Sequence, residues 1–512
     1  MKRNWMIAIA ALVVLAGFFM MQQKPAPVAQ KEAPKQEAPA AKSAEAPKPA
    51  DVKTEEAKKA EEAKKAAEEA AKAAELKKAE EAKKAAEEAA KAAETQKSEA
   101  PKPSEVPSVA SVAASVAGKA VEKAAETAAQ VKPEVAATVA AVAGALSAAP
   151  AGGEPVRIGY LAALTGDWAA YGQTEEKTAR LAVEEINGKG GVLGRKLELV
   201  VYDFRTRAED AVNAVRRMIE EDKVVAIVGA NGSGINIATA PIVNRLGVSQ
   251  VGTVSTNPLV TVDEKGAVRP YSFRICFTDP YQGKLIAFFA ANELKKMNAA
   301  ILYDVGNDYS QGLREFFMKS YGEYGGKVVA DLGFRGGQDV DFRAQLTEIR
   351  DKGADVLVLP NMGKEMALIM KQARELGMKD IVFVGGDGYG EFMWEIAGAA
   401  MEDSYWINHV APEDPAMQPF FKAYKERWKD ECKEFVNGVL GYDSIYWVAD
   451  AISRAGSPDP KLIRDALEAT KDLKLHHASI TMDTATHNPV DKDGVVLIAR
   501  GGKGQFFKKI KP

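Results

Sequence analysis

Short apolar runs alternate with amphipathic segments along most of the chain after Val156. Residues 156–164 and 224–229 are nearly continuous runs of β-branched and other apolar residues, which is typical of strands buried on both faces. Residues 174–187 and 208–221 instead carry apolar side chains at the spacing of one helix face. Strands that alternate with helices in this way predict an α/β fold, in which right-handed crossover helices cover both faces of a parallel sheet.

The same alternation begins again at residue 299 and runs to residue 386. A single core rarely exceeds about 250–300 residues, so two successive α/β units predict two lobes with a cleft between them. Residues 415–512 add helical segments and end in two strand-like runs, 494–500 and 504–510, that must complete one lobe or both. Ligands of open α/β sheets bind at the carboxyl ends of the strands, so the loops at those ends are the candidates for a site.

The first 30 residues are basic and then apolar. Lys2 and Arg3 precede an apolar run from Trp5 to Met21, which is close to the lower limit of ~17 residues for a membrane span. The residues after this run offer no good small-residue cleavage site and no cysteine for a lipid anchor. We therefore favour an uncleaved membrane anchor over a signal segment that is removed, and we expect the remainder of the chain in the periplasm.

Residues 31–153 form a low-complexity segment of mostly Ala, Lys, Glu, Pro and Val. Residues 60–78 recur almost unchanged as residues 79–97. These repeats consist of strong helix formers with Glu-to-Lys pairs four residues apart, which predicts a solvated helix over about 55–95. We favour a passive tether; the alternative is an arm that binds other envelope proteins.

Charge and cysteine content narrow the classes of function. The net charge of −3 and the lack of aromatics interleaved with basic clusters argue against nucleic-acid binding. The only cysteines, Cys276 and Cys432, form no CxxC motif, and we favour two buried free thiols over a disulfide. No HExxH or GxSxG motif is present, so we expect no enzyme, metal or cofactor. The histidines are His409, His476, His477 and His487, of which the adjacent pair is expected at the surface.

The glycine-rich loop "VGANGSG", residues 228–234, follows a predicted strand and precedes a predicted helix. It lacks the lysine of a Walker A loop, and its spacing differs from the GxGxxG of dinucleotide sites, so we expect no nucleotide here. A helix N-terminus with free N–H groups, together with the hydroxyl of Ser233, suits a carboxylate. The alternative is a simple packing turn.

Two more loops of the first unit carry candidate contacts. Residues 253–258, "TVSTNP", offer the hydroxyls of Ser255 and Thr256, which either complete an anion pocket beside Ser233 or cap a helix. Residues 164–173, "LTGDWAAYGQ", place Trp168 and Tyr171 in a loop, where they either wall a cleft or serve ordinary packing.

The second unit supplies a carboxylate and a tyrosine. Tyr309 follows one strand, Asn361 and Met362 follow another, and Asp387 lies between glycines after a third. Asp387 either serves a tight turn or faces a cationic group of a ligand. Hydroxyls and helix N–H groups in one lobe, with an acid and a tyrosine in the other, are complementary to a zwitterion.

Residues from about 155 to 512 resemble the periplasmic leucine/isoleucine/valine-binding type of solute-binding protein, which serves ABC transporters. The stretches that carry the resemblance, in the family's order, are "IGYLAALTGDWAAYGQ", "AVEEINGKGGVLGRKLELVVYD", "VVAIVGANGSG", "GVSQVGTVSTNP", "YSFRICFTDPYQG", "AAILYDVGNDYSQG" and "DIVFVGGDGY". The resemblance implies the type I periplasmic-binding fold, two Rossmann-like lobes that are joined by a three-strand hinge and close on a ligand. It implies a first lobe of about 155–273 and 410–480, and a second of about 277–405 and 490–512.

The resemblance also implies a set of ligand contacts. These are Trp168, Tyr171, Ser233, Val254, Ser255, Thr256, Tyr309, Met362 and Asp387. Ser233 and the loop around Thr256 are implied to hold an α-carboxylate, and Asp387 an α-ammonium with help from Thr256. Relatives often carry an aromatic residue where this chain has Met362, and Trp168 is a bulky addition, so both positions bear on side-chain specificity.

Our hypothesis from the sequence is a tethered extracytoplasmic solute-binding protein that delivers an amino acid to an ABC permease, with a monomeric binding domain. Branched-chain amino acids or related small zwitterions are the expected ligands, and amides, urea and aromatic acids are the alternatives. A second hypothesis is a sensory module that signals through a membrane partner.

Overall fold

The computed structural model describes residues 153–490 and 493–512. The expected anchor at residues 1–30 and the expected helix at about 55–95 lie outside the described residues. Within the described ranges, none of the helices combines the length and the apolar character needed to cross a membrane.

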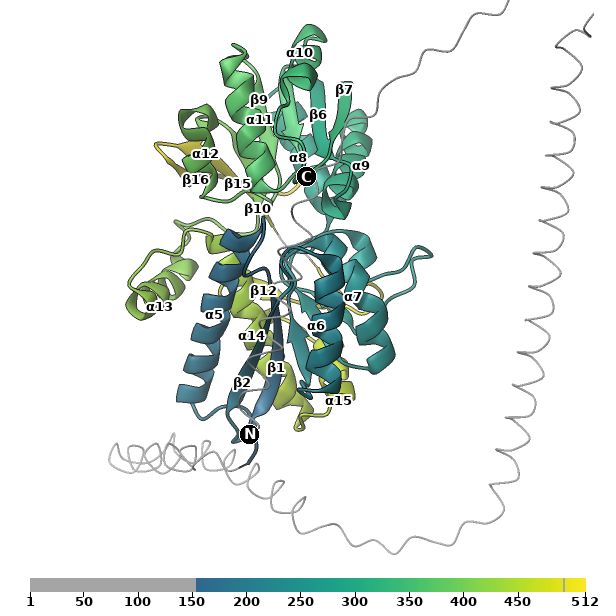
Figure 1. Ribbon diagram of the computed structural model, residues 1–512, viewed down its shortest axis with the longest axis vertical. Coiled ribbons are helices and arrows are strands. Elements are labelled where there is room, and N and C mark those ends of the chain that lie inside the picture. Colours follow the sequence, from purple (N-terminus) through teal and green to yellow (C-terminus); the bar gives the residue numbers. More distant parts are fainter. Residues whose placement is uncertain (1–152, 491–492) are drawn as a thin grey trace, which may run out of the picture. The chain divides into compact units, whose positions relative to one another are not determined.

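The first lobe contains a five-stranded parallel sheet in the order β2-β1-β3-β4-β5 (Figure 1). Its strands are β1 (Val156–Ala162), β2 (Leu197–Asp203), β3 (Ala226–Val228), β4 (Ser249–Gly252) and β5 (Ser272–Arg274). The helices of this lobe are α5 (Ala169–Gly188), α6 (Ala208–Glu220), α7 (Ser233–Leu246), α14 (Phe435–Ala455) and α15 (Pro460–Glu468), with a short helix η2 (Pro258–Val260). The predicted strand–helix alternation is confirmed in this lobe.

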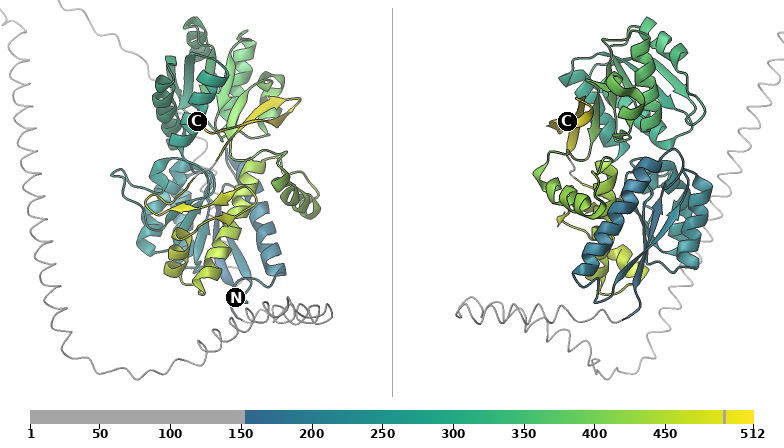
Figure 2. Two further views of the ribbon diagram at one scale, coloured as in Figure 1. Left: turned by 180° about the vertical axis from the view of Figure 1, so that it is seen from behind. Right: turned by 60° about the vertical axis from the view of Figure 1, so that its left-hand side comes forward.

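The second lobe contains a seven-stranded sheet in the order β16-β15-β10-β9-β8-β6-β7. The parallel strands are β6 (Asn298–Asp304), β7 (Lys327–Phe334), β8 (Val356–Leu359), β9 (Val382–Gly385) and β10 (Tyr405–Asn408). The two C-terminal runs form an antiparallel extension of this sheet (Figure 2), β15 (Gly494–Arg500) and β16 (Lys503–Ile510). The helices are α8 (Asp279–Phe288), η3 (Phe289–Glu293), α9 (Asp308–Glu323), α10 (Arg343–Asp351), α11 (Gly363–Glu375), α12 (Met393–Ala397) and η4 (Gly398–Met401).

The chain passes between the two sheets three times, after β5, after β10 and before β15. After β10 it continues through η5 (Pro415–Met417) and α13 (Gln418–Trp428) into α14. Between α15 and β15 lie two short hairpins, β11 (Leu473–Lys474) with β12 (Ser479–Ile480) and β13 (Met482–Asp483) with β14 (Asn488–Pro489). Because the chain passes three times, each lobe is built from separated parts of the sequence.

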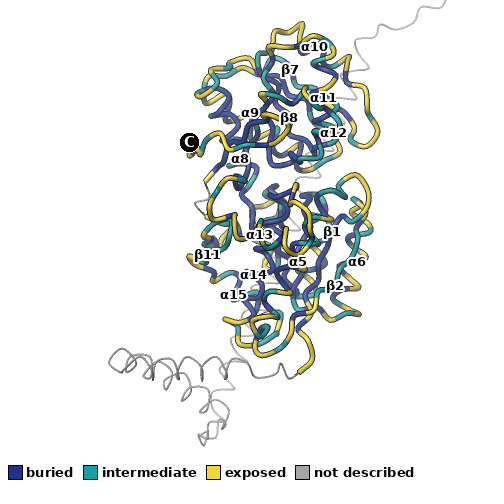
Figure 3. The backbone as a smooth tube through the Cα atoms, turned by 90° about the vertical axis from the view of Figure 1, so that its left-hand side faces the viewer, coloured by how far each residue is buried: buried dark blue, intermediate teal, exposed yellow. Residues whose placement is uncertain are grey.

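The long helix α14 is the packing centre of the first lobe. It lies along α5, and most of its residues are buried (Figure 3). Gly441 is required there, because a Cβ atom at this position would lie 2.6 Å from the hydroxyl of Tyr160 on β1. Helix and strand can approach this closely only at a residue without a side chain.

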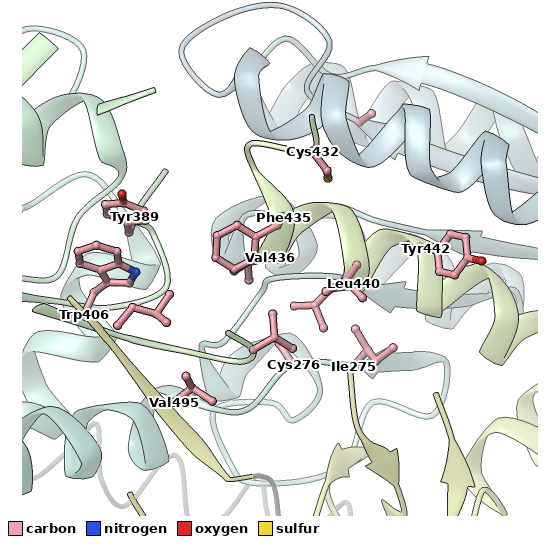
Figure 4. Packing of buried hydrophobic residues seen from close by; sticks show 14 of the residues in the cluster. Ile275, Cys276, Tyr389, Trp406, Cys432, Phe435, Val436, Leu440, Tyr442 and Val495 are labelled. Carbon is pink, nitrogen blue, oxygen red and sulfur yellow. The ribbon is translucent and has the colours of Figure 1, made fainter. Parts of the chain in front are cut away.

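Both cysteines lie near the passages between the lobes (Figure 4). Cys276 follows β5, and Cys432 lies just before α14. Both are buried and neither forms a disulfide, which confirms the prediction of free thiols.

A buried carboxylate of α14 holds the segment that follows α15. Asp443 accepts hydrogen bonds from His476 Nδ1 at 2.8 Å, His477 Nδ1 at 2.6 Å and the His477 backbone N–H at 2.8 Å. The side chain of His477 is fully buried, so the expectation of a surface position is wrong for this residue. The bond to Asp443 raises the pKa of His476, against a smaller opposite effect of burial.

The raised pKa of His476 predicts how its contribution to stability depends on pH. The stabilisation is fully present below the pKa of an unfolded histidine, ~6.5, and is lost as the pH rises through the folded pKa. We therefore expect His476→Gln to lower the free energy of unfolding by about 1 kcal/mol at pH 6 and by less at pH 9. Urea denaturation at the two pH values measures this, and an equal loss at both would contradict it.

Candidate functional site

Loops at the carboxyl ends of strands from both sheets meet between the lobes and enclose one small cavity, which we call the inner cavity. Its volume is about 10 Å³, roughly the space that one water molecule requires. It is lined by Trp168, Tyr171, Asn231, Gly232, Ser233, Val254, Asn307, Tyr309, Met362, Asp387, Gly388 and Asn437.

All predicted contacts except Ser255 and Thr256 line the inner cavity. Those two side chains are fully buried behind Val254. The hydroxyl of Ser255 donates to the carbonyl oxygen of Ala230 at 3.0 Å and also contacts Asn236. Ser255 therefore fixes the glycine-rich loop instead of facing the cavity.

A larger hollow of about 320 Å³, the outer hollow, lies next to the inner cavity. Trp168, Asn307 and Met362 line both spaces. Trp168 packs against Gly232, where an added Cβ atom would lie 2.4 Å from the indole ring. Trp168 and Met362 thus stand between the outer hollow and the inner cavity, in a position to control what fits.

The lobes are held together by polar contacts around this cavity. Tyr171 Oη donates to the carbonyl oxygen of Gly388 at 2.6 Å and accepts from the Gly363 N–H at 3.0 Å. Lys364 Nζ forms a salt bridge of 2.8 Å with Asp167. Because these contacts join residues of different lobes, the structure shows the cleft closed.

Two further contacts act across the cleft. Asn257 Nδ2 donates to the carbonyl oxygen of Asp308 at 2.8 Å. At the other side, the carboxylate of Glu434 accepts from the N–H groups of Glu391 and Phe392, each at 3.1 Å. Burial raises the pKa of Glu434 to about 7, and these backbone hydrogen bonds oppose the rise.

The N-terminus of α7 forms one end of the inner cavity. Ser233 is the first residue of α7, and its Oγ accepts from the Asn257 N–H at 3.2 Å. The preceding loop turns at Gly229, with φ of 96°, where an added Cβ atom would lie 2.2 Å from the carbonyl oxygen of Leu161. A helix N-terminus offers unpaired N–H groups and a positive potential, so this end suits an anionic group.

A buried carboxyl group supports this end from behind. Oε1 of Glu175 on α5 accepts from the hydroxyl of Thr253 at 3.0 Å and from Asn437 Nδ2 at 3.2 Å. Burial raises the pKa of Glu175 to about 8, although both hydrogen bonds oppose it. A protonated Glu175 places no negative charge behind the N-terminus of α7, which preserves its attraction for an anion.

Asp387 is the acid that the second lobe contributes to the lining of the inner cavity. It lies in the loop after β9, is 3% exposed, and its Oδ2 is 3.0 Å from His409 Nε2. Gly386 and Gly388 let neighbours approach, because a Cβ atom at Gly386 would lie 2.5 Å from the Tyr309 hydroxyl. That hydroxyl accepts from the Gly388 N–H at 3.3 Å.

A second acid lies behind Asp387. Asp279, the first residue of α8, is fully buried, and its burial raises its pKa well above the usual range. The negative charge of Asp387 raises it further. The backbone carbonyl oxygen of Thr256, predicted as a ligand contact, accepts from the Asp279 N–H at 2.8 Å, and the Thr256 side chain is fully buried and does not line the inner cavity. Within the two described ranges, no group of three or more His, Cys, Asp or Glu residues is arranged to hold a metal.

Sequence reasoning missed several residues of the site. Asn231 and Asn307 lie in loops that also contain predicted contacts or directly precede one, whereas Asn437 lies on α14 and His409 follows β10. Nothing local in the sequence around Asn437 or His409 distinguishes them, because they reach the site only through the passages between lobes.

Comparisons with known proteins agree with this architecture. The family described as periplasmic binding protein matches residues 155–503. The leucine-, isoleucine-, valine-, threonine- and alanine-binding protein of Pseudomonas aeruginosa is 30% identical over 62% of this chain and 83% of its own length.

Two solved structures are similar over nearly their whole length. A leucine-binding protein from Thermotoga maritima has a TM-score of 0.65 and 35% identity, and the match covers 70% of this chain and 99% of that one. A branched-chain amino acid transporter substrate-binding protein from Streptococcus pneumoniae, solved in complex with isoleucine, has a TM-score of 0.64 and 32% identity, with 70% and 100% covered.

Glu175→Gln tests the protonated state of the buried carboxyl. Gln keeps the oxygen that accepts both hydrogen bonds and removes the titrating proton. The folded protein holds this proton up to about pH 8, whereas the unfolded chain releases it near pH 4.3. Stability of the wild type therefore falls between these pH values, by up to about 1.4 kcal/mol per pH unit. The free energy of unfolding of the variant, relative to wild type, should be higher at pH 8 than at pH 5; a constant difference would argue for an ionised Glu175.

Tyr171→Phe tests the contact that closes the cleft. Loss of two buried hydrogen bonds should lower the ratio of closed to open protein without ligand by roughly fivefold or more. Small-angle X-ray scattering should show a larger radius of gyration for the variant. Lys364→Met is the matched control, because an exposed ion pair contributes little. Equal effects of the two variants would show that Tyr171 is not the principal closing contact.

Proposed function

The chain belongs to the periplasmic binding protein family, and from that premise we propose that it binds a branched-chain amino acid or a related small zwitterion for an ABC transporter. The observation that carries the proposal is the polarity of the inner cavity. The first lobe contributes the N-terminus of α7 with Ser233 to the lining, and the second lobe contributes Asp387. A ligand with a carboxylate and an ammonium group matches these two groups, and relatives named for leucine, isoleucine and valine support this choice.

The apolar lining supports the choice of side chain. Val254, Met362 and Trp168 also line the inner cavity. An aliphatic side chain gains about 25 cal/mol for each Å² of apolar surface removed from water there. Urea offers no such surface, and an aromatic acid offers no ammonium group for Asp387.

Closure follows from contacts that exist only when the lobes meet. The inner cavity of about 10 Å³ is much smaller than an amino acid, so binding requires the lobes to separate. The ligand first contacts one lobe, and the second lobe then closes on it, with Trp168 and Met362 adjusting to its side chain. A ligand that touches both lobes binds the closed form better than the open one, and that difference in affinity shifts the population toward the closed form. The closed form is the one presented to the permease.

The family is extracytoplasmic, and we place the N-terminal region accordingly. Residues 5–21 serve as an inner-membrane anchor, and residues 31–153 form a tether that lets a monomeric two-lobed domain, residues 154–512, reach the permease. If this is correct, the protein stays with inner membranes after a high-salt wash, and deletion of residues 1–30 releases it. Recovery of the intact chain in the soluble periplasmic fraction would contradict the anchor.

Isothermal titration with an amino-acid panel tests the ligand. We expect binding of leucine, isoleucine or valine, and no binding of urea or benzoate. Asp387→Asn removes the charge that faces the ammonium group and should weaken binding by about 30-fold or more. Asp351→Asn, exposed at the end of α10, is the control and should change affinity little. Full affinity of Asp387→Asn would overturn the assigned role of this residue.

A further inference from the structure

The partner of Asp387 lies on one of the passages between the lobes. His409 follows β10 directly, at the start of the second passage, and its side chain is fully buried. Its ring stacks on Phe277, with centroids 3.7 Å apart and an interplanar angle of 19°. Phe277 lies on the first passage, between β5 and α8. Two passages therefore meet in a stacked pair, and one ring of that pair contacts the acid of the inner cavity.

We propose that His409 is a positioning residue of the ammonium site, which fixes Asp387 from behind and makes ligand affinity fall at acidic pH. This inference rests on the proposed function. Asp387 lines the inner cavity, but His409 does not. The ring contacts Oδ2 of Asp387 at 3.0 Å, on a carboxylate that also lines the cavity. His409 acts through Asp387 and makes no contact with the ligand.

The stacking on Phe277 limits the movement of the imidazole ring. Tyr281 packs edge-on against Phe277, with ring centroids 6.3 Å apart. A ring held on its face by Phe277 and at its edge by Asp387 has little freedom to turn. The acid is thereby held in one orientation before the ligand arrives, which reduces the entropy lost on binding.

The charge of the imidazole decides how strongly Asp387 attracts a cation. A neutral ring that donates from Nε2 leaves the full charge on the carboxylate. A protonated ring balances that charge and lies close enough to repel an ammonium group, so the ligand prefers the neutral ring. Histidine is the side chain that ordinarily changes charge between pH 5 and 8, and binding in that range should release a proton.

Four other charged or titratable groups lie around His409, and none of them is a second imidazole. Asp279 is buried behind Asp387, and Tyr309 and Tyr281 are phenols whose ordinary pKa of about 10 lies far above this range. The guanidinium of Arg274 on β5 donates to the carbonyl oxygens of Ser255 and Asn257, at 2.6 and 2.7 Å. Because Asp279 can also titrate, the test must isolate the histidine by substitution.

His409→Gln provides that isolation, because Gln keeps an N–H donor and does not titrate. Leucine affinity of the full-length protein is measured by isothermal titration from pH 8 to pH 5.5. We expect wild-type affinity to fall by about fivefold or more, His409→Gln to keep most of its affinity across the range, and His409→Ala to bind more weakly than His409→Gln at pH 8. His476→Gln, at a residue that does not line the cavity, should retain the wild-type profile. If His409→Gln shows the same pH dependence as wild type, the inference is wrong while the proposed function stands.

A measurement without ligand covers the case in which the proposed function fails. In the full-length protein labelled with 15N-histidine, four histidines are present, and His409 is assigned by comparison with His409→Gln. We expect its Nε2 to carry a proton at pH 8 and its resonances to shift in Asp387→Asn. A ring protonated only at Nδ1 at pH 8, or one that does not respond to Asp387→Asn, overturns the inference whichever ligand the protein binds.

Discussion

The structure depends on one constraint: closing the cleft takes polar groups of two lobes out of water, and each of them needs a partner across the gap. The carboxyl ends of parallel strands supply these groups, because their loops leave backbone N–H and C=O groups without a sheet partner. The Tyr171 hydroxyl forms hydrogen bonds with one backbone C=O group and one backbone N–H group of the second lobe. The carboxylate of Glu434 accepts hydrogen bonds from two other backbone N–H groups of that lobe. The same loops that hold the lobes together form the inner cavity, so the surface that closes the cleft also lines the cavity.

The distribution of charge follows from this constraint. Glu175, Asp279 and Glu434 are buried acids whose pKa values are raised mainly by burial. A carboxyl group that is uncharged when buried avoids most of the cost of desolvation. Asp387 differs from them because a histidine contacts one of its oxygens while its other side faces the cavity. Of these four acids, only Asp387 lines the inner cavity.

The sequence predicted the fold and most of the cavity lining because these follow from local patterns. Strand and helix periodicity gave both units, and the strand-end loops then gave Trp168, Ser233 and Asp387. Ser255 was a less successful choice, because successive residues of an extended loop point to opposite sides, so that only Val254 faces the cavity. His409 and Asn437 come from segments after β10, and their proximity depends on how the chain passes between lobes, which periodicity does not encode.

The passages between the lobes are more than linkers in this chain. A hinge between two rigid lobes needs few contacts of its own, yet here Phe277 and His409 stack where two passages lie side by side. Such a stack contributes about 0.5–1.5 kcal/mol beyond the area it buries, and it is joined to the acid that faces the cavity. A change in charge at that acid therefore acts on a residue of the hinge directly. Because lobe movement must turn the passages, the proposed role of His409 would couple the strength of ligand binding to the freedom of the hinge through a single imidazole ring.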